Sequence, residues 1–340
     1  MMQILEINDV FKLEGGGSLS GLKIAYTKYG ELNPSKSNVI WICHALTANS
    51  DPMEWWPSFF SGSEGFDFAD QYIVCANILG SCYGTTGPLS IDPLTTTPYY
   101  HSFPAISIRD MVNAHQLLAS HLGIEKIQLL IGSSMGGYQV VEWCIMFPLM
   151  IKRICLLATS AKETPWGIAI HTAQRLAIES DSSFKSDGEN AGEKGLIAAR
   201  AFGIITYRSF ASFRSMQSEI GNEKTDDFKA SSYMIHQGNK LIKRFNAYSY
   251  HALTRAMDTH NIARGRKKKI AGILQDIKQR ALIIGIKSDI LCPISEQQFL
   301  AEHIKVSTFI EIDSIYGHDG FLVEGQLISK FLFTWMQEGE

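Results

Sequence analysis

The sequence predicts an α/β fold with a mostly parallel central sheet, helices on both faces of the sheet, and an inserted helical lid. Two observations indicate this fold class. Short runs of β-branched and aromatic residues alternate with longer amphipathic stretches, which is typical of an α/β sheet. The alternation stops for roughly 110 residues and then resumes, and an insertion of that length is too long for a loop in a compact domain.

Seven runs have the composition of strands. The first, residues 21–30, alternates its apolar and polar side chains. Most of the later runs are almost continuously apolar, as expected for strands that are buried on both faces of a parallel sheet. These later runs lie at residues 38–46, 71–79, 126–132, 151–159, 279–287 and 307–313.

The segments between several of the predicted strands have the apolar spacing of helices. This spacing predicts helices at 107–124 and 135–147, with Ser107 placed to cap the first of them. Inside the insertion, three further segments are helical in pattern: residues 170–181, 195–210 and 231–260. We therefore divide the chain into a core domain, residues 1–164 and 278–340, and a helical lid domain, residues 165–277, above the carboxyl edge of the sheet.

Composition excludes several classes of function. The chain has 340 residues and a net charge of −3, which gives no reason to expect nucleic acid or an acidic membrane surface as a partner. No window approaches the roughly 20 apolar residues of a membrane span, and the N-terminus lacks the pattern of a signal peptide. The six cysteines show no metal-ligand spacing, and buried reduced thiols fit a reducing compartment. We expect a cytoplasmic protein with no metal and no bound cofactor.

Residues 132–136 read Gly-Ser-Ser-Met-Gly between a predicted strand and a predicted helix. A Gly-x-Ser-x-Gly pattern in that context is a nucleophile elbow, a sharp turn that presents a serine at the mouth of a site. Only Ser134 fits the central position, and Ser133 occupies the variable one. The helix that follows places its positive end at Ser134, where negative charge would develop. The alternative is an ordinary glycine–serine turn.

A serine hydroxyl needs a base, and the base needs a carboxylate to hold it. In the fold that uses this elbow, the α/β-hydrolase fold, the chain order is serine, acid, histidine. Only His318 follows the final predicted strand and precedes a last helix, although a surface histidine is the alternative there. Asp289 stands at the end of a predicted strand, and Asp276 and Asp313 are worse placed. We predict Ser134, Asp289 and His318 as a catalytic triad.

The oxyanion that forms during acyl transfer needs backbone N–H donors. Met135, directly after the nucleophile, supplies one predicted donor. The loop after an early strand supplies the other, with Leu46 as the best candidate and Thr47 nearby. His44 in this loop is expected to support the loop rather than act as a second base. These residues describe a serine acyl-transfer enzyme, and water as the acceptor would make it an esterase.

Several stretches resemble the homoserine O-acetyltransferases of this fold. They include "CHALT", "NILGSCYGTTGPLSIDP", "GSSMGG", "KSDILCP" and "YGHDGFLVE", and the resemblance runs from about residue 38 to residue 324 in family order. It implies ping-pong transfer of acetyl from acetyl-CoA, a co-substrate rather than a bound cofactor, to L-homoserine in methionine biosynthesis. It also implies a homodimer.

The resemblance assigns substrate-binding roles as well. Arg200 matches the arginine that holds the substrate carboxylate, with Arg175 and Arg208 as its rivals. Asp319 matches the residue that receives the ammonium, and we group Thr47 with these substrate-binding residues.

Two features depart from the family pattern. Ser133 stands where glycine is usual, and the middle of the lid, residues 210–232, is compressed. Related enzymes use succinyl-CoA or accept serine, so these substrates remain alternatives. So do a serine esterase of the same fold and a non-catalytic binding protein. We expect the basic run at 264–269 to be a solvated face, with contact to an anionic cofactor as the alternative.

Overall fold

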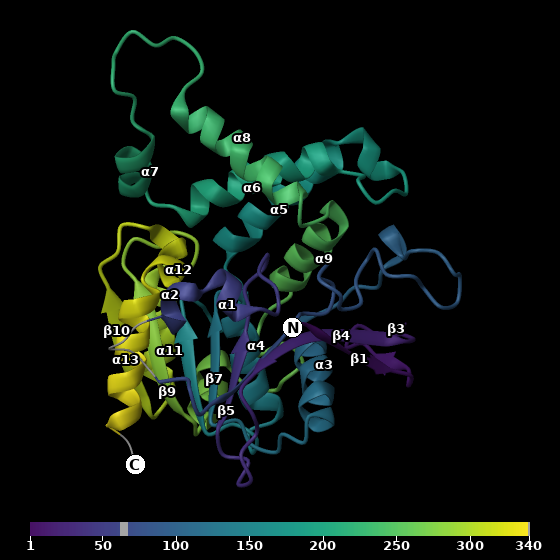
Figure 1. Ribbon diagram of the computed structural model, residues 1–340, viewed down its shortest axis with the longest axis vertical. Coiled ribbons are helices and arrows are strands. Elements are labelled where there is room, and N and C mark those ends of the chain that lie inside the picture. Colours follow the sequence, from purple (N-terminus) through teal and green to yellow (C-terminus); the bar gives the residue numbers. More distant parts are fainter. Residues whose placement is uncertain (62–66, 339–340) are drawn as a thin grey trace.

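The computed structural model describes residues 1–61 and 67–338. A twisted sheet forms the lower half of the molecule, and helices of the lid lie above the carboxyl ends of its parallel strands (Figure 1). The strands are β1 (Gln3–Ile7), β2 (Phe11–Lys12), β3 (Ser18–Leu19), β4 (Leu22–Tyr29), β5 (Val39–Cys43), β6 (Tyr72–Ala76), β7 (Leu129–Ser133), β8 (Arg153–Leu157), β9 (Arg280–Ile286) and β10 (Ser307–Ile312).

Helices connect and cover these strands. The α-helices are α1 (Pro52–Trp55), α2 (Pro57–Phe60), α3 (Ile108–His121), α4 (Met135–Met146), α5 (Pro165–Ser180), α6 (Glu193–Tyr207), α7 (Phe210–Gln217), α8 (Lys229–Ile242), α9 (Ala247–Asp258), α10 (Ile270–Asp276), α11 (Ile294–His303), α12 (Gly320–Val323) and α13 (Gly325–Gln337). Short 3-10 helices lie at Tyr100–Ser102, Ser182–Lys185 and Gly317–Asp319.

The main sheet has eight strands in the order β1-β4-β6-β5-β7-β8-β9-β10. From β6 through β5 to the β10 edge, neighbouring strands pair in parallel, whereas β4 pairs antiparallel with both β1 and β6. The prediction of a mostly parallel sheet is therefore confirmed, and each of the seven predicted runs overlaps a strand. We did not predict β1 or the small β2–β3 hairpin. Most of the side chains of β1 are exposed, so it lacks the apolar signal of the inner strands.

Both faces of the sheet are covered by apolar packing. Alternate residues of β5, such as Trp41 and Ile42, enter separate clusters on opposite faces. One cluster joins the sheet to α3, α4, α10 and α11, and the other joins it to α2 and α13. Burial on both faces is the physical reason why these strands read as unbroken apolar runs. At roughly 25 cal/mol per Å² of apolar surface removed from water, such burial is the main stabilising contribution to the fold.

The predicted cap of α3 is present. Ser107 accepts a hydrogen bond from the backbone N–H of Asp110, and the Asp110 carboxylate accepts one from the backbone N–H of Ser107 at 2.8 Å. This reciprocal capping box satisfies two donors that the first turn of a helix otherwise leaves unpaired.

Between β8 and β9, the residues that the structure describes form helices and no named strand. Helices α5 to α8 lie above the sheet, and α9 runs between them and the core (Figure 1). At the end of this segment, Ile273 and Leu274 of α10 pack into the main core cluster. The division of the chain into core and lid domains stays a prediction. None of the described helices is long and apolar enough to cross a membrane.

The basic run at 264–269 is not simply a solvated face, so that expectation is wrong for two of its members. Arg264 pairs with Glu14 at 2.9 Å, and Arg266 pairs with the buried Glu142 at 2.6 Å. Arg109 on α3 contacts both of these glutamates. The run therefore fastens the chain segment that leaves the lid to the core.

Candidate active site

Ser134 lies in the turn between β7 and α4, with φ of 53° and ψ of −125°. A non-glycine residue in this region is strained, and the surrounding packing must hold it there. Two close approaches make the turn possible. A Cβ on Gly132 would lie 2.3 Å from the carbonyl oxygen of Gly136, and a Cβ on Gly136 would lie 2.0 Å from that of Cys43. Side chains at these positions would push the helix away from the sheet and open the turn.

The two adjacent serines face different surroundings. Ser133 is a residue of β7, its Oγ is buried, and this oxygen has no hydrogen-bond partner among the described residues. Ser134 Oγ lies 2.9 Å from Nε2 of His318 and lines a cavity. Of the two, only Ser134 is placed to react with a ligand.

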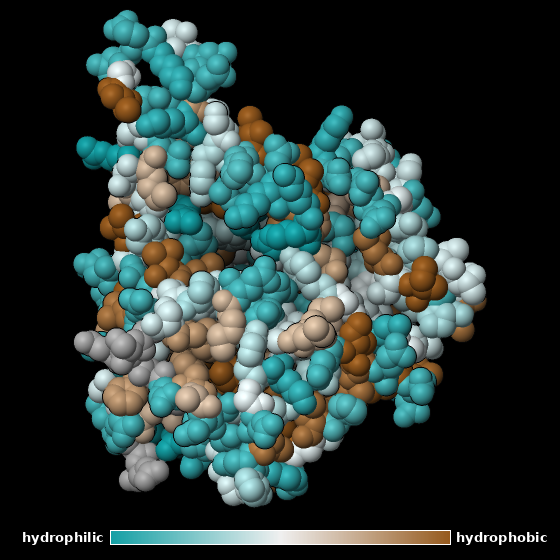
Figure 2. Space-filling model, viewed as in Figure 1, coloured by the Kyte–Doolittle hydropathy of each residue, from teal (hydrophilic) through white to brown (hydrophobic). Residues whose placement is uncertain are grey.

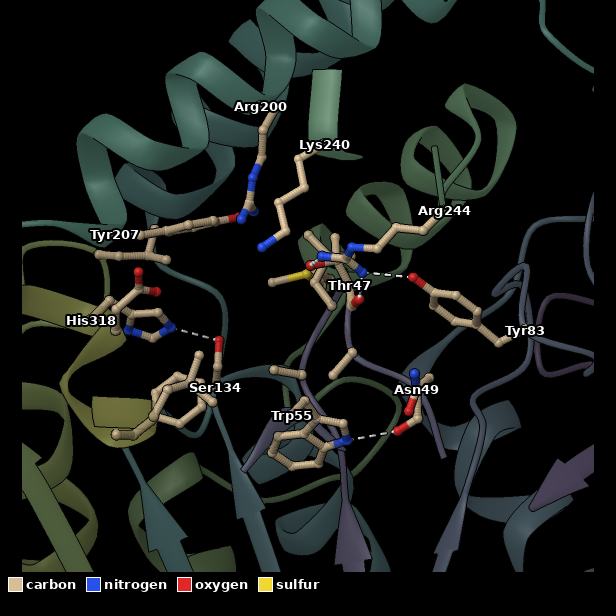
Figure 3. A pocket seen from close by; sticks show the side chains of 18 of the residues that line it. Thr47, Asn49, Trp55, Tyr83, Ser134, Arg200, Tyr207, Lys240, Arg244 and His318 are labelled. Atoms are coloured by element: carbon tan, nitrogen blue, oxygen red, sulfur yellow. Dashed lines mark hydrogen bonds between the residues drawn. The ribbon is translucent and has the colours of Figure 1, made fainter. Parts of the chain in front are cut away.

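The structure brings Ser134, His318 and Asp289 into one hydrogen-bonded chain. Figure 3 shows the hydrogen bond between His318 and Ser134. His318 lies in the 3-10 turn after β10, and its Nδ1 is 2.6 Å from Oδ2 of Asp289. Asp289 follows β9, and its Oδ1 accepts the backbone N–H groups of Leu291 and Cys292 at 2.8 and 2.9 Å. A carboxylate can only accept, so the Nδ1 proton donates to it and Nε2 is left to accept the serine proton.

Two opposing effects act on the pKa of His318. Burial alone would lower this pKa, because desolvation disfavours the imidazolium. The adjacent Asp289 carboxylate raises this pKa, and Asp319 and Glu163 raise it further. Together these carboxylates outweigh burial, so the pKa lies above the ordinary histidine value. This environment stabilises the charged imidazolium that a general base forms when it takes a proton.

Two backbone N–H groups are free beside Ser134. Met135 is the first residue of α4, where no helical acceptor is available, and Leu46 lies in the loop after β5. Neither of these N–H groups donates a hydrogen bond among the described residues. Leu46 lines the cavity together with Ser134. Free donors that flank a nucleophile can bind a developing oxyanion.

The cavity at this site has a volume of about 400 Å³ and lies between the lid and the core. The face shown in Figure 2 carries mainly hydrophilic side chains over the lid, with scattered hydrophobic ones between them. All three predicted substrate-binding residues, Arg200, Asp319 and Thr47, line the cavity with Ser134. Figure 3 shows Arg200 reaching down from α6 toward the triad.

Arg200 has no carboxylate partner among the described residues. Its guanidinium lies 5.4 Å from the ring centre of Tyr207, and its buried Nε makes no hydrogen bond. Both rivals that the sequence suggested are already paired: Arg175 with Asp258 at 2.6 Å, and Arg208 with Asp319 at 2.8 Å. Arg200 is therefore the one of these three arginines with a charge left for an anionic ligand.

Asp319, the residue expected to receive the ammonium, is already paired with Arg208. Burial raises the pKa of Asp319, and Arg208 and Arg200 oppose the rise. Asp319 lines the cavity even though its carboxylate is paired with Arg208.

Sequence reasoning missed two cations of the cavity, Lys240 on α8 and Arg244 just after α8. Both point into the cavity from the lid, opposite Thr47 and Ser134 (Figure 3). Their spacing of four residues places them on one side of the chain, which is a signal that sequence alone offers. Nothing in the sequence said which face of α8 turns toward the serine.

His44 and Cys82 lie close to the cavity without taking part in the triad. Burial lowers the pKa of His44 to about 4, so its imidazole is neutral. Its Nδ1 donates to the Ala45 carbonyl at 2.9 Å, while Nε2 accepts the Ile78 N–H at 3.2 Å. Burial raises the pKa of Cys82 to about 11, so its thiol stays protonated. Within the described residues, no cluster of His, Cys, Asp and Glu could hold a metal ion.

The fold and the linked serine, histidine and aspartate define an enzyme of the α/β-hydrolase class. The family profile of the alpha/beta hydrolase fold matches residues 38–324. A homoserine O-acetyltransferase of Trichormus variabilis is 44% identical over 330 residues, which cover 96% of this chain and 91% of that protein. The chain belongs to the homoserine O-acetyltransferase family, as the resemblance in the sequence predicted.

Solved structures agree on the fold. A homoserine O-acetyltransferase from Bacillus anthracis superposes with a TM-score of 0.90 at 23% identity, covering 99% of this chain and 97% of that one. An esterase superposes with a TM-score of 0.87, also at 23% identity, over 98% and 99% of the two chains. The backbone fold alone therefore does not separate transfer from hydrolysis, and the chemistry must be argued from the cavity.

Proposed function

We propose that this protein transfers an acetyl group from acetyl-CoA to the hydroxyl group of L-homoserine, releasing CoA and O-acetyl-L-homoserine. The observation that carries the proposal is the unpaired Arg200 guanidinium in the cavity of the hydrogen-bonded Ser134. An amino-acid acceptor is a zwitterion, and a guanidinium matches its carboxylate with two parallel hydrogen bonds. An esterase acting on neutral esters has no need of such a cation.

In the first half-reaction, His318 Nε2 takes the proton of Ser134 Oγ as that oxygen attacks the thioester carbon. The N–H groups of Leu46 and Met135 stabilise the oxyanion of the tetrahedral intermediate. The C–S bond then breaks, and the CoA thiolate leaves with the proton from His318. Asp289 stabilises the imidazolium throughout and does not take its proton.

In the second half-reaction, the homoserine hydroxyl gives its proton to His318 and attacks the acetyl-serine carbonyl. Ser134 Oγ leaves and recovers the proton, so the enzyme returns to its starting state. Arg200 holds the acceptor carboxylate, Asp319 receives its ammonium, and Thr47 contacts it from the core side. The lid above the cavity limits the access of water, which would otherwise hydrolyse the acyl-enzyme.

Release of free CoA from acetyl-CoA, with and without homoserine, tests the proposal. We expect release to depend on homoserine and the acetylated amino acid to accumulate in equal amount. Ser134→Ala should abolish both signals, whereas Ser133→Ala should keep them. Succinyl-CoA and serine run in parallel decide between the related donors and acceptors. Release at the full rate without any acceptor would instead establish a hydrolase, and binding without turnover would establish a non-catalytic protein.

We extend the proposal to a cytoplasmic homodimer. Phe202 and Ile205 are large exposed apolar residues one helical turn apart on α6, and exposed apolar patches often mark protein interfaces. Sedimentation should give twice the monomer mass, and Ile205→Asp should shift it to the monomer. Leu94→Asp, at an exposed position of the core domain, is the control. A wild-type monomer at all concentrations would refute the dimer.

A further inference from the structure

Arg244 links the lid to the loop that carries the predicted oxyanion donor. It follows the last turn of α8, and its Nη1 donates to the backbone carbonyl of Thr47. The same nitrogen donates to the hydroxyl of Tyr83 at 2.6 Å (Figure 3). The guanidinium thus holds two core loops, residues 44–50 and 80–87, from above.

The main chain at Arg244 is itself fastened to the core. Cys82 Sγ donates to the Arg244 carbonyl at 3.4 Å, and the Tyr83 ring packs edge-on against Phe245 with ring centres 5.7 Å apart. Arg244 is therefore held at both its backbone and its guanidinium. These contacts give a structural role to the "GSCYGTTGP" stretch, which the triad does not use.

The position of the Leu46 N–H depends on the peptide groups around it. The Ala45 carbonyl, in the same peptide group as the Leu46 N–H, accepts from His44 Nδ1 at 2.9 Å and from the Ala48 N–H at 3.1 Å. The C=O and N–H of a trans peptide point in opposite directions, so these bonds direct the Leu46 N–H away from His44. On the other side of Leu46, the Arg244 side chain donates to the Thr47 carbonyl.

We propose that Arg244 is a positioning residue that ties the lid to the oxyanion loop, so that the oxyanion site is in place only while the lid is seated. The inference rests on the proposed function of Ser134 and goes beyond it. An enzyme built this way would stabilise the oxyanion poorly whenever the lid is displaced and water can enter. Coupling of this kind favours transfer over hydrolysis.

The competing role for Arg244 is to bind an anionic group of the acyl donor, such as a phosphate of CoA. Its contacts favour positioning, because Nη1 already serves two protein oxygens. Lys240, one turn earlier in the same cavity, makes no hydrogen bond or ion pair with the described residues. Lys240 is the better placed of the two to meet a donor anion.

The test measures acylation of Ser134 with two donors, acetyl-CoA and p-nitrophenyl acetate, which carries no phosphate. For Arg244→Ala, we expect the acylation rate constant to fall about tenfold with both donors, less than the loss of a whole oxyanion donor. The KM for each donor should change little, and Arg244→Lys should recover part of the rate. Lys243→Met is the matched control, because it removes a neighbouring exposed charge that makes no hydrogen bond or ion pair with either loop among the described residues.

Tyr83→Phe supplies a second variant that keeps the ring and loses only the hydroxyl. It should lower acylation less than Arg244→Ala does, and the double variant should be no slower than Arg244→Ala alone, because both changes act on one network. A loss confined to acetyl-CoA with a raised KM would establish anion binding and overturn the proposal. Unchanged rates in a folded Arg244→Ala protein would also overturn the proposal. Wild-type protein that fails to transfer acetyl to homoserine would instead refute the proposed function.

Discussion

At the scale of single residues, the site depends on charge that neighbouring groups compensate only in part. His318 has a carboxylate on one ring nitrogen and a hydroxyl on the other. Its pKa is raised because the carboxylates around it, Asp289 foremost, together outweigh burial. Arg200 has a tyrosine ring beside it and no carboxylate partner among the described residues. The first arrangement prepares a base, and the second leaves a positive charge for a substrate.

The pH dependence of acylation should follow His318. This residue must be neutral to accept a proton, so kcat/KM for the acyl donor should rise with pH, with a midpoint above pH 6.5. In Asp289→Asn the raising influence is lost, so the midpoint should move to lower pH. The rate on the plateau should fall about 10⁴-fold, because the tautomer of the imidazole is no longer held. Stopped-flow rates measured from about pH 5 to about pH 9, which spans the pKa range of histidine, give both effects. An unchanged midpoint in the variant would show that Asp289 does not raise the pKa of His318.

Arg200→Ala should weaken acceptance of the amino acid more than acylation by the donor. Loss of a charge-assisted contact costs about 1.5–3 kcal/mol, which corresponds to a rise in KM for homoserine of about 10- to 150-fold. Steady-state kinetics with homoserine varied at saturating acetyl-CoA gives this number. Arg214→Ala, at an exposed lid position away from the cavity, is the control. If the homoserine KM stayed the same, Arg200 would not hold the acceptor.

At the scale of elements, the elbow exists because β7 and α4 approach the neighbouring strand without side chains between them. A Cβ at position 136 would meet the backbone oxygen of Cys43, which belongs to β5. The same strand leads directly into the loop with Leu46, so the packing that positions Ser134 also fixes where the oxyanion loop begins.

Gly136→Ala should therefore reduce both stability and activity. The added methyl group would overlap backbone rather than a movable side chain, and overpacking of this kind costs about 1–3 kcal/mol. Urea denaturation with activity measured on the same samples reveals the change. Gly188→Ala is the matched control, because a Cβ there meets nothing within 4 Å. Equal stability of the two variants would contradict the packing argument.

At the scale of the whole molecule, an ion-pair network closes the lid segment back onto the core. Glu14 near the N-terminus, Arg109 on α3 and Glu142 on α4 meet Arg264 and Arg266, which follow the lid helices. Glu142 is buried, so its carboxylate depends on these guanidinium groups in place of water.

Arg266→Met should lower the free energy of unfolding by about 2 kcal/mol, since Arg109 remains to bond Glu142. Chemical denaturation of the purified protein measures this loss. Lys267→Met removes the same charge from an exposed neighbour and should stay within about 0.5 kcal/mol of wild type. If the two variants lost equal stability, general charge repulsion rather than this pair would be the cause.

Much of the fold and of the candidate triad could be predicted from the sequence because both leave local signals. Buried parallel strands such as β7 and β9 must be apolar on both faces, and the elbow around Ser134 requires small residues at fixed spacing. Chain order then restricted the acid and the base to Asp289 and His318. The edge strand β1 gave no such signal, because most of its side chains are exposed.

Spacing along the chain was enough to predict the type of sheet and the candidate nucleophile, and the resemblance of several stretches to a known family was enough to predict the family. Only the tertiary structure decided which lid cations enter the cavity. Arg175 and Arg208 are taken by Asp258 and Asp319, while Arg200, Lys240 and Arg244 face the serine. The reason is physical: the direction in which a helix presents a charged side chain depends on how that helix packs against distant elements, and helical periodicity does not specify that packing.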